Sequence, residues 1–506
     1  MGSQNNLCMD VLKDEDALNL FNTTAGDCIE QCDLEVLAKD VSEACGGLPI
    51  AIYDGIYFHW KLAEIWGGFG MFENINTLEE AWNRVGTLVR KLVSSSLLID
   101  TNNESFSMHD VVRIVANSIA CRDQHMFMVT NGVVPMNWVD KDSLKTCTGI
   151  SLQNIGELPK ELVCLHLKFL YMKTKKDALK IPDEFFTGMP MLRVLHLVGF
   201  DLLSLPTSLG LLLNLRALCM DKCKVKDISL IGELKTLEIL NFRGSKIMWL
   251  PVEICKLIGL RLLDLNGCSN LKDIPPNFIS SLTRSEELYL GGTSIQWEVQ
   301  GRSNTCLDEL KGLSHLTTLE ISILHTKVLS KGLFSKKLER YNITIGRCSW
   351  DHRLRLKQHE TSRKLELNLG TSCSCFDFED APPKMPSVKN ILSVLDGQGF
   401  PELEQLWVQD GPCLLTVVDS FESESRDPFP SLETLVLHKI FSIGREEDKI
   451  QLKELHSMTL ARLPQLTVFC SASEVILEEE VDTLTPFFNE KVGPEFFSGL
   501  NLHNAV

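Results

Sequence analysis

The sequence predicts an α/β protein, a curved solenoid of short strands that is preceded by a small, mostly helical unit. Three observations lead to this fold class. A triplet of apolar residues recurs every 20–25 residues through most of the chain. The first quarter of the 506 residues instead shows helical periodicity and capping motifs. A hydrophobic content of 44% and a charged content of 23% are those of an ordinary folded protein.

The repeat that organises most of the chain has the form L-x-x-L-x-L. Its most regular copies begin at Leu192, Leu215, Leu237 and Leu260, at spacings of 23, 22 and 23 residues. This is the period of leucine-rich repeats, in which each unit supplies a short strand and a return segment, and neighbouring units must stack to bury their apolar faces. We expect a leucine-rich-repeat domain over residues 141–470. Its regular strands are expected, side by side in one parallel sheet, at 195–197, 218–220, 240–242 and 263–265.

Several cysteines lie in or near the repeats. Cys223 and Cys268 occupy the position where leucine-rich repeats carry Asn or Cys, and a buried side chain is favoured there over metal or redox chemistry. The register is lost between about 366 and 400, where Cys373 and Cys375 form a C-x-C without a second pair at ligand spacing. We therefore expect no metal site. Residues 471–506 are expected to form an acidic tail.

Residues 1–140 follow a different pattern. A capping box at Thr77–Glu80 begins a predicted helix that runs through Leu92. Its inward face is expected to consist of Ala81, Trp82, Val85, Leu88, Val89 and Leu92. A strand, a turn and a short strand follow up to Ser107, and a second capping box, Ser107 to Asp110, begins the next helix. Helices with a hairpin resemble a winged-helix unit.

His109 lies in the first turn of that next predicted helix. Free backbone N–H groups and the helix dipole favour an anion there, and a histidine can donate a hydrogen bond to a phosphate. A capped surface helix that happens to carry a histidine is the alternative.

Three motifs in order resemble one known family. C-G-G-L-P-I-A-I at 45–52, M-H-D at 108–110 and the repeat array are similar to the C-terminal portion of plant coiled-coil nucleotide-binding leucine-rich-repeat disease resistance proteins. The segment at 11–21 resembles a further conserved stretch of that family. The resemblance implies that residues 1–52 are the C-terminal part of the helical region of its nucleotide-binding (NB-ARC) domain. It also implies that residues 53–140 are a winged-helix-like remnant of that domain.

The resemblance also implies roles for single residues. Pro49 would line the adenine side of an ADP site, although a simple helix stop is the alternative, and His109 would reach the β-phosphate. Gly47, Leu48, Met108 and Asp110 would support the two motifs.

The sequence departs from the family pattern in one decisive respect. No G-x-x-x-x-G-K-[ST] motif occurs in it, so nothing recognisable would hold the α- and β-phosphates or Mg²⁺. We expect an N-terminally truncated and internally deleted member of the family. The ADP or ATP of the family is not expected to bind tightly, no other cofactor is expected, and we place no catalytic residues.

Charge is unevenly distributed along the chain. Acidic residues outnumber basic ones by 20 to 8 in residues 1–140 and by 19 to 7 in 401–506, whereas 141–400 carry 28 acidic and 35 basic residues. An acidic chain argues against nucleic-acid binding. The basic residues concentrate in a predicted partner-binding patch that consists of Lys336, Lys337, Arg340, Arg347, Arg353, Arg355 and Lys357. We expect this patch to contact residues 1–140 intramolecularly, with a solvated strip as the alternative.

The expected function is that of a plant defence protein of the intracellular immune-receptor type. It would act through recognition of a pathogen effector or a guarded host protein by its repeats, or through autoinhibition. The alternative is a leucine-rich-repeat adaptor, such as a ubiquitin-ligase substrate receptor, which an F-box-like module would support. Seventeen cysteines, no signal-peptide pattern and no run of eighteen apolar residues favour the cytoplasm, without a membrane span.

Overall fold

The structure is a computed structural model of the whole chain. It describes residues 57–58, 77–95, 97–100, 105–108, 112, 126–130, 146–154, 156–174, 179–299, 301–325, 328–330, 332–334, 338–346, 363–368, 400, 402–411, 431–440, 457–461 and 475–477.

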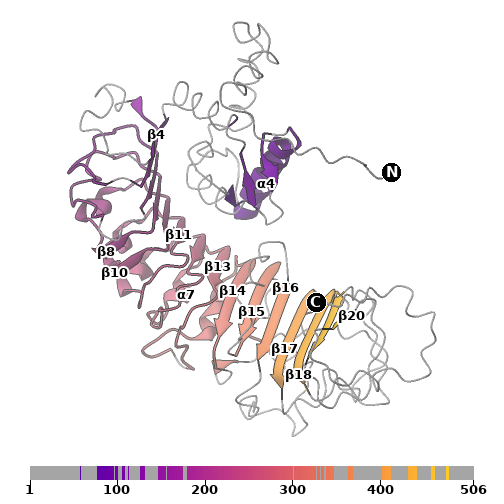
Figure 1. Cartoon of the computed structure of the whole chain (residues 1–506). Coiled ribbons are helices and arrows are strands. Elements are labelled where there is room, and N and C mark those ends of the chain that lie inside the picture. Colours follow the sequence, from indigo (N-terminus) through magenta and orange to yellow (C-terminus); the bar gives the residue numbers. More distant parts are fainter. Residues whose placement is uncertain are drawn as a thin grey trace, which may run out of the picture.

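Most of the described residues form one curved solenoid (Figure 1). Within the described ranges, fifteen strands make a single sheet in which each neighbouring pair is parallel. In chain order these strands are β4 (Met126–Thr130), β5 (Gly149–Gln153), β6 (Phe169–Lys173), β7 (Val194–Val198), β9 (Ala217–Asp221), β11 (Ile239–Asn241), β12 (Leu262–Asp264), β13 (Glu287–Leu290), β14 (Thr318–Ile323), β15 (Arg340–Ile345), β16 (Arg363–Asn368), β17 (Gln405–Gly411), β18 (Thr434–Ile440), β19 (Ser457–Ala461) and β20 (Val475–Leu477).

The leucine triplet explains how each repeat folds. In β7, Leu195 and Leu197 are fully or almost fully buried and pack in the main core, together with Leu192 that precedes the strand. Because side chains alternate across a strand, the residues between the leucines point to the other face of the sheet. The registers pair equivalent residues of successive repeats, so that Leu195 lies beside Leu170 and Leu218.

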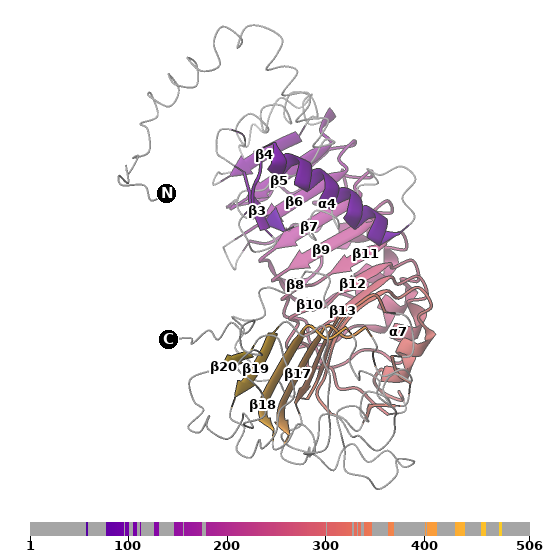
Figure 2. The ribbon, with the colours of Figure 1, turned by 90° about the vertical axis from the view of Figure 1, so that its right-hand side faces the viewer.

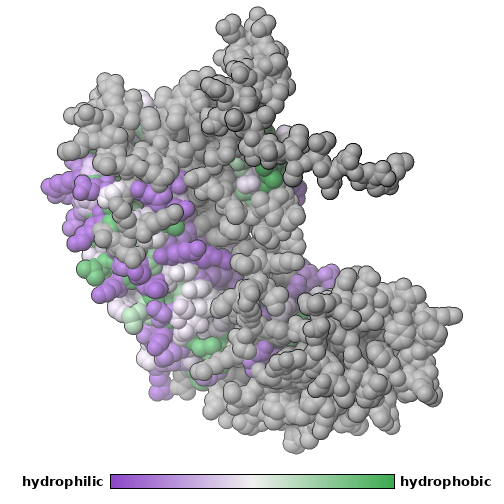
Figure 3. All heavy atoms as spheres, viewed as in Figure 1, coloured by the Kyte–Doolittle hydropathy of each residue, from purple (hydrophilic) through white to green (hydrophobic). Residues whose placement is uncertain are grey.

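The outer side of the solenoid is made of short return segments. These are the two-stranded parallel ribbon of β8 (Asp201–Ser204) and β10 (Lys224–Asp227), the 3-10 helices η3 (Thr207–Leu211), η4 (Ser229–Glu233), η5 (Val252–Lys256) and η6 (Leu307–Gly312), and the short helix α7 (Phe278–Ser281). Neighbouring return segments stack closely. If Gly232 in η4 carried a Cβ atom, that atom would lie 2.5 Å from the carbonyl oxygen of Glu253 in η5. On the visible face, apolar residues stand among hydrophilic ones (Figure 3).

The first part of the chain contributes a smaller unit. Helix α4 (Leu78–Ser94) is accompanied by a three-stranded antiparallel sheet of β1 (Tyr57–Phe58), β3 (Ser105–Ser107) and β2 (Ile99–Asp100). Thr77 and Glu80 form the predicted capping box: Thr77 Oγ1 accepts from Glu80 N, and Glu80 Oε2 accepts from Thr77 N. The predicted helix and the two short strands after it are confirmed, whereas the predicted turn between those strands lies outside the described residues. The winged-helix assignment stays a prediction.

Several sequence expectations needed correction. The regular strands lie at the predicted triplets, but β11 and β12 begin and end one residue earlier than expected. The sheet extends beyond the predicted domain limits of 141 and 470, because β4 lies ahead of the first and β20 beyond the second. Strand β16 was not among the predicted strands and overlaps the start of the segment at 366–400 where the register is expected to be lost. Strand β17 pairs directly with it, and residues 369–399 lie outside the described residues. Residues 1–52 lie outside the described residues. The predicted acidic tail at 471–506 also lies outside them, apart from strand β20.

Candidate protein-interaction site

The sheet has a second apolar cluster on the face that points to the inside of the curve, here called the inner face. Six residues of consecutive inner strands belong to it, although the repeat pattern would place them in solvent. We call them the inner-face patch: Phe169, Tyr171, Val194, Ala217, Ile239 and Leu262. They are at most 4% exposed, so another part of the chain must shield them from water.

Helix α4 and the hairpin that follows it cover this patch. The second cluster also contains residues from these elements, namely Leu78, Val85, Val89, Leu92, Leu98, Phe106 and Met108. Two views at right angles show α4 lying against the inner face, across the strands and not along them (Figures 1 and 2). The strongly amphipathic pattern of α4 explains this position, because its buried residues recur at helical spacing along one side.

The beginning of α4 is fixed to the sheet by two adjacent carboxylates, Glu286 and Glu287, which we call the acid pair. The backbone N–H of Leu78 donates to Glu286 Oε2 at 2.6 Å, and the indole N–H of Trp82 donates to Glu287 Oε1 at 2.8 Å. The Leu78 amide is one of the free donors of the first helical turn, where a carboxylate is favoured by the helix dipole.

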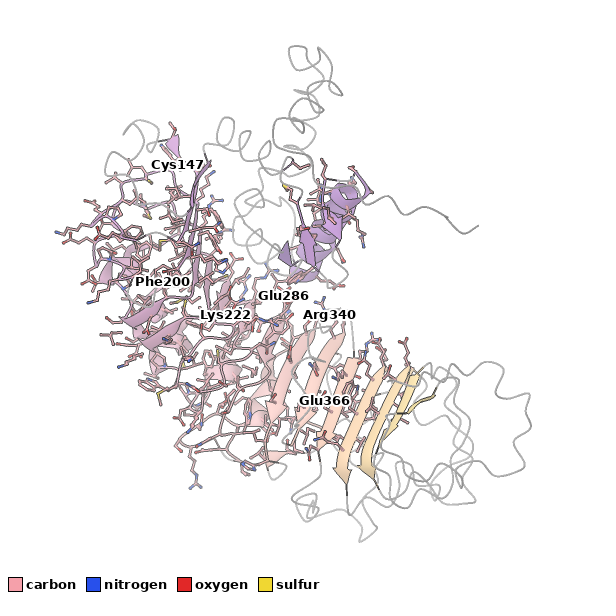
Figure 4. All side chains as sticks on the ribbon, in the orientation of Figure 1. Cys147, Phe200, Lys222, Glu286, Arg340 and Glu366 are labelled. Atoms are coloured by element: carbon pink, nitrogen blue, oxygen red, sulfur yellow. The ribbon has the colours of Figure 1, made fainter. Side chains whose placement is uncertain are left out.

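Neighbouring strands hold the acid pair in place. Glu286 also accepts from Arg261 Nε at 2.6 Å. Glu287 accepts from Arg340 Nη2 at 3.1 Å and from the Tyr289 hydroxyl at 2.8 Å. Glu286 and Arg340 lie on the part of the sheet close to the beginning of α4 (Figure 4). The helix is therefore bonded to side chains that several repeats have already positioned.

Burial dominates the electrostatics of this cluster. It raises the pKa of the Glu287 carboxyl, and Arg340, Tyr289 and Trp82 offset part of that rise. Burial and then the Glu287 charge raise the pKa of Tyr289 well above its ordinary value, so that Tyr289 stays a donor. The arrangement orients two carboxylates toward donors of α4.

The polar part of the inner face next to the patch is also bonded internally. His196 Nε2 and Asp221 Oδ2 are 2.6 Å apart and both residues are buried. The ring of Tyr171 meets the His196 imidazole edge to face at 5.2 Å between ring centres. This pair forms a polar border along the inner-face patch.

The predicted site residues are placed unevenly by the structure. Met108 is buried in the second cluster, whereas Gly47, Leu48, Pro49, His109 and Asp110 lie outside the described residues.

Of the predicted basic patch, the described residues include Arg340 alone. Lys336, Lys337, Arg347, Arg353, Arg355 and Lys357 lie outside them. Arg340 is not part of a free basic surface. Its guanidinium binds Glu287 and donates to Thr318 Oγ1 at 3.0 Å.

Residues 1–140 do contact the repeats within the described residues. The contact expected through the basic patch stays a prediction, because six of its seven residues lie outside the described ranges. In the described residues the contact is largely apolar, and the polar groups contributed by the repeats are the carboxylates of Glu286 and Glu287. The charge distribution along the chain predicts the acidic side in residues 1–140. The acid pair was not predicted, and its available signal is two adjacent glutamates where the inner strand Glu287–Leu290 begins.

The ladder cysteines are buried side chains, as predicted. The Cys223 thiol contacts the carbonyl oxygens of Asp221 at 3.4 Å and Leu197 at 3.6 Å, and the Cys268 thiol contacts that of Phe242 at 3.1 Å. Burial raises the pKa of the Cys268 thiol to about 12. These thiols therefore link neighbouring turns.

Comparisons with known proteins agree with this fold. A family model described as "Leucine-rich repeat region" matches residues 186–398. The chain is similar to disease resistance protein At4g27190 of Arabidopsis thaliana, at 25% identity over 85% of this chain and 53% of the relative. A probable disease resistance protein of the same plant, At4g27220, is 24% identical over 87% of this chain and 56% of its own length. Disease resistance protein RPS5 is 26% identical over 76% of this chain and 43% of its own length.

Two solved structures match parts of the chain. A leucine-rich-repeat protein of Leptospira interrogans has a TM-score of 0.39 and 19% identity, covering 67% of this chain and 81% of that one. An internalin of Listeria monocytogenes has a TM-score of 0.40 and 18% identity, covering 63% of this chain and 76% of that one.

The repeats and the parallel sheet define this chain as a leucine-rich-repeat protein. Over most of its length it is similar to plant disease resistance proteins. The chain spans about half the length of the first two of these relatives. Among the described residues, no helix combines the length and apolarity needed to cross a bilayer.

Proposed function

We propose that this chain is a plant defence protein of the intracellular immune-receptor type, in which the repeats recognise a protein. The observation that carries the proposal is the occupied inner face. Residues upstream of the repeats shield an apolar patch and bind two carboxylates on it. A contact of this kind restrains the upstream segment until the repeats engage a partner. Its relatives, named disease resistance proteins, support a role in defence.

The proposal assigns the recognition step to a pathogen effector or to a guarded host protein, and places it in the cytoplasm. It assigns no catalysis to the chain and no tightly held cofactor. The proposal treats the M-H-D and G-L-P segments, with His109 and Pro49, as degenerate parts of an ADP switch.

The test is transient expression of the full chain in leaf tissue, with defence-marker transcripts as the readout. Wild type is expected to be silent. Val85→Glu combined with Val89→Glu places two carboxylates in the apolar contact and is expected to induce the markers. The matched control is Asn83→Glu with Thr87→Glu, which adds the same charges at the same spacing on the exposed side of α4.

Two outcomes separate the proposal from its alternative. Induction by the buried-face variant alone supports a restrained immune receptor. Equal silence of all three proteins at equal abundance would contradict it, and would leave an adaptor without immune-receptor signalling as the better description.

A further inference from the structure

We propose that the inner-face patch and the acid pair together form a docking site for an amphipathic α-helix of a protein partner, which binds by displacing α4. This inference rests on the proposed function and names the kind of partner that the repeats recognise. It follows from the chemistry of the present occupant, which shows what the site accepts.

The first requirement is set by shape. Helix α4 has 17 residues, which corresponds to a length of about 25 Å at ~1.5 Å per residue. It lies across the strands (Figure 2). From β13 through β12, β11, β9 and β7 to β6 the sheet order gives five strand spacings, about 24 Å at ~4.8 Å each. A helix of four to five turns therefore matches the length of the site.

The second requirement is an apolar stripe. Leu78, Val85, Val89 and Leu92 of α4 pack in one cluster with the inner-face patch. Their spacing of seven, four and three residues keeps them on one side of a helix, whereas a strand would turn alternate side chains away from the patch. The six patch residues are apolar or aromatic, so that a charged partner surface would lose its hydration there without compensation.

The third requirement comes from the acid pair, which gives the site a direction. Glu286 accepts an amide of the first helical turn, and Glu287 accepts an indole N–H one turn further on. Only the beginning of a helix offers unpaired backbone N–H groups, so these carboxylates select the N-terminal end. A partner helix must begin at β13 and present a side-chain donor at the position of Trp82.

Competition with α4 sets how the site responds. Because α4 belongs to the same chain, its effective concentration at the patch is on the order of millimolar. A separate helix with the same contacts is therefore excluded while α4 stays docked. It binds only when it makes better contacts or when the docking of α4 has been weakened.

The experiment uses a synthetic peptide of residues 77–95, labelled at its C-terminus, and fluorescence anisotropy with the full chain. The opened variant, Val85→Glu with Val89→Glu, retains the whole patch and the acid pair. We expect it to bind the peptide at least about tenfold more tightly than wild type does, because the tethered competitor is gone. A peptide with Asn83→Glu and Thr87→Glu is expected to bind equally, and one with Val85→Glu and Val89→Glu to bind poorly.

A second variant tests the acid pair. Adding Glu286→Gln and Glu287→Gln to the opened variant is expected to lower its affinity for the peptide about tenfold or more. The reason is that hydrogen bonds to charged acceptors are replaced by hydrogen bonds to neutral ones. If the opened variant loses its circular-dichroism spectrum, Trp82→Phe replaces it as a milder way to weaken α4, with the same order of affinities expected.

The proposal is overturned if a folded opened variant binds the peptide no better than wild type, or binds the two charge-substituted peptides alike. These outcomes are independent of signalling. Peptide binding with silence in leaf tissue would contradict the proposed function and support the helix site, whereas marker induction without peptide binding would do the reverse.

Discussion

The bond between Trp82 and Glu287 allows a direct perturbation of the α4 contact. Trp82→Phe keeps an aromatic ring but removes the indole N–H that donates to Glu287 Oε1 at 2.8 Å. Glu287 keeps Arg340 and Tyr289 as partners, so the buried carboxylate is not left without donors. The substitution should therefore loosen the helix without unfolding the repeats.

The expected magnitude follows from these contacts. A hydrogen bond to a charged group contributes about 1.5–3 kcal/mol, and the low end applies where other donors remain. The smaller ring removes roughly 1 kcal/mol more at most, because Trp82 is only partly buried. The lost hydrogen bond alone, at about 1.5 kcal/mol, corresponds to an increase of roughly tenfold in the open population.

Amide hydrogen exchange of α4 measures this population. Exchange of the α4 amides should become about tenfold faster in Trp82→Phe, while the amides of β7 and β9 stay protected. Tyr289→Phe is the matched control. It removes another donor from the same carboxylate but leaves the bond to α4 in place, so α4 exchange should change much less.

Unchanged exchange of α4 in Trp82→Phe would refute the reasoning, because the indole bond would then not hold the helix on the sheet. The same conclusion would follow if Tyr289→Phe accelerated α4 exchange as strongly as Trp82→Phe does.

Three further predictions concern titration, nucleotide and thiols. Burial raises the pKa of Glu287 in the folded protein above its value in the unfolded chain. Its contribution to stability is therefore fully present below the unfolded pKa and is lost as the pH rises through the folded pKa. Urea unfolding should show wild type losing stability relative to Glu287→Gln over this pH range, and a stability difference that does not change with pH would contradict this. Isothermal titration of ADP should show no micromolar binding, since a Kd of 1 μM needs about 8 kcal/mol of binding free energy. Micromolar binding that His109→Ala abolishes would instead support a working ADP switch. In native protein, Cys164 and Cys268, whose pKa values burial raises to about 11 and about 12, should resist iodoacetamide until unfolding, whereas rapid labelling would mean that the turns open.

The parts of the fold that could be predicted are those with a local physical cause. Leu192, Leu195 and Leu197 repeat at a spacing that fixes both the strand and the face it buries. The Thr77–Glu80 capping box marks the beginning of α4 because it satisfies free donors of the first turn. Strand β16 was missed because its R-K-L-E-L-N sequence follows a highly charged stretch and keeps only part of the triplet.

The candidate site could not be predicted in the same way. Periodicity shows which side of α4 is apolar but not which surface will cover it. The available signal was the column of apolar residues at inner-face positions of successive repeats, among them Phe169, Val194 and Ile239. Glu286 and Glu287 resemble ordinary surface charges in the sequence. Their role depends on Arg261, Arg340 and Trp82, which the fold brings together from distant positions.

Oxidative footprinting of side chains tests the central claim, that α4 covers the inner face of the repeats, most directly. Phe169 and Tyr171 are 0% and 4% exposed, so hydroxyl radicals should leave both unmodified in the wild-type chain. Both should be oxidised in Val85→Glu with Val89→Glu, and neither in Asn83→Glu with Thr87→Glu. Oxidation of Phe169 and Tyr171 in the wild-type protein, at the level reached in the buried-face variant, would contradict the account.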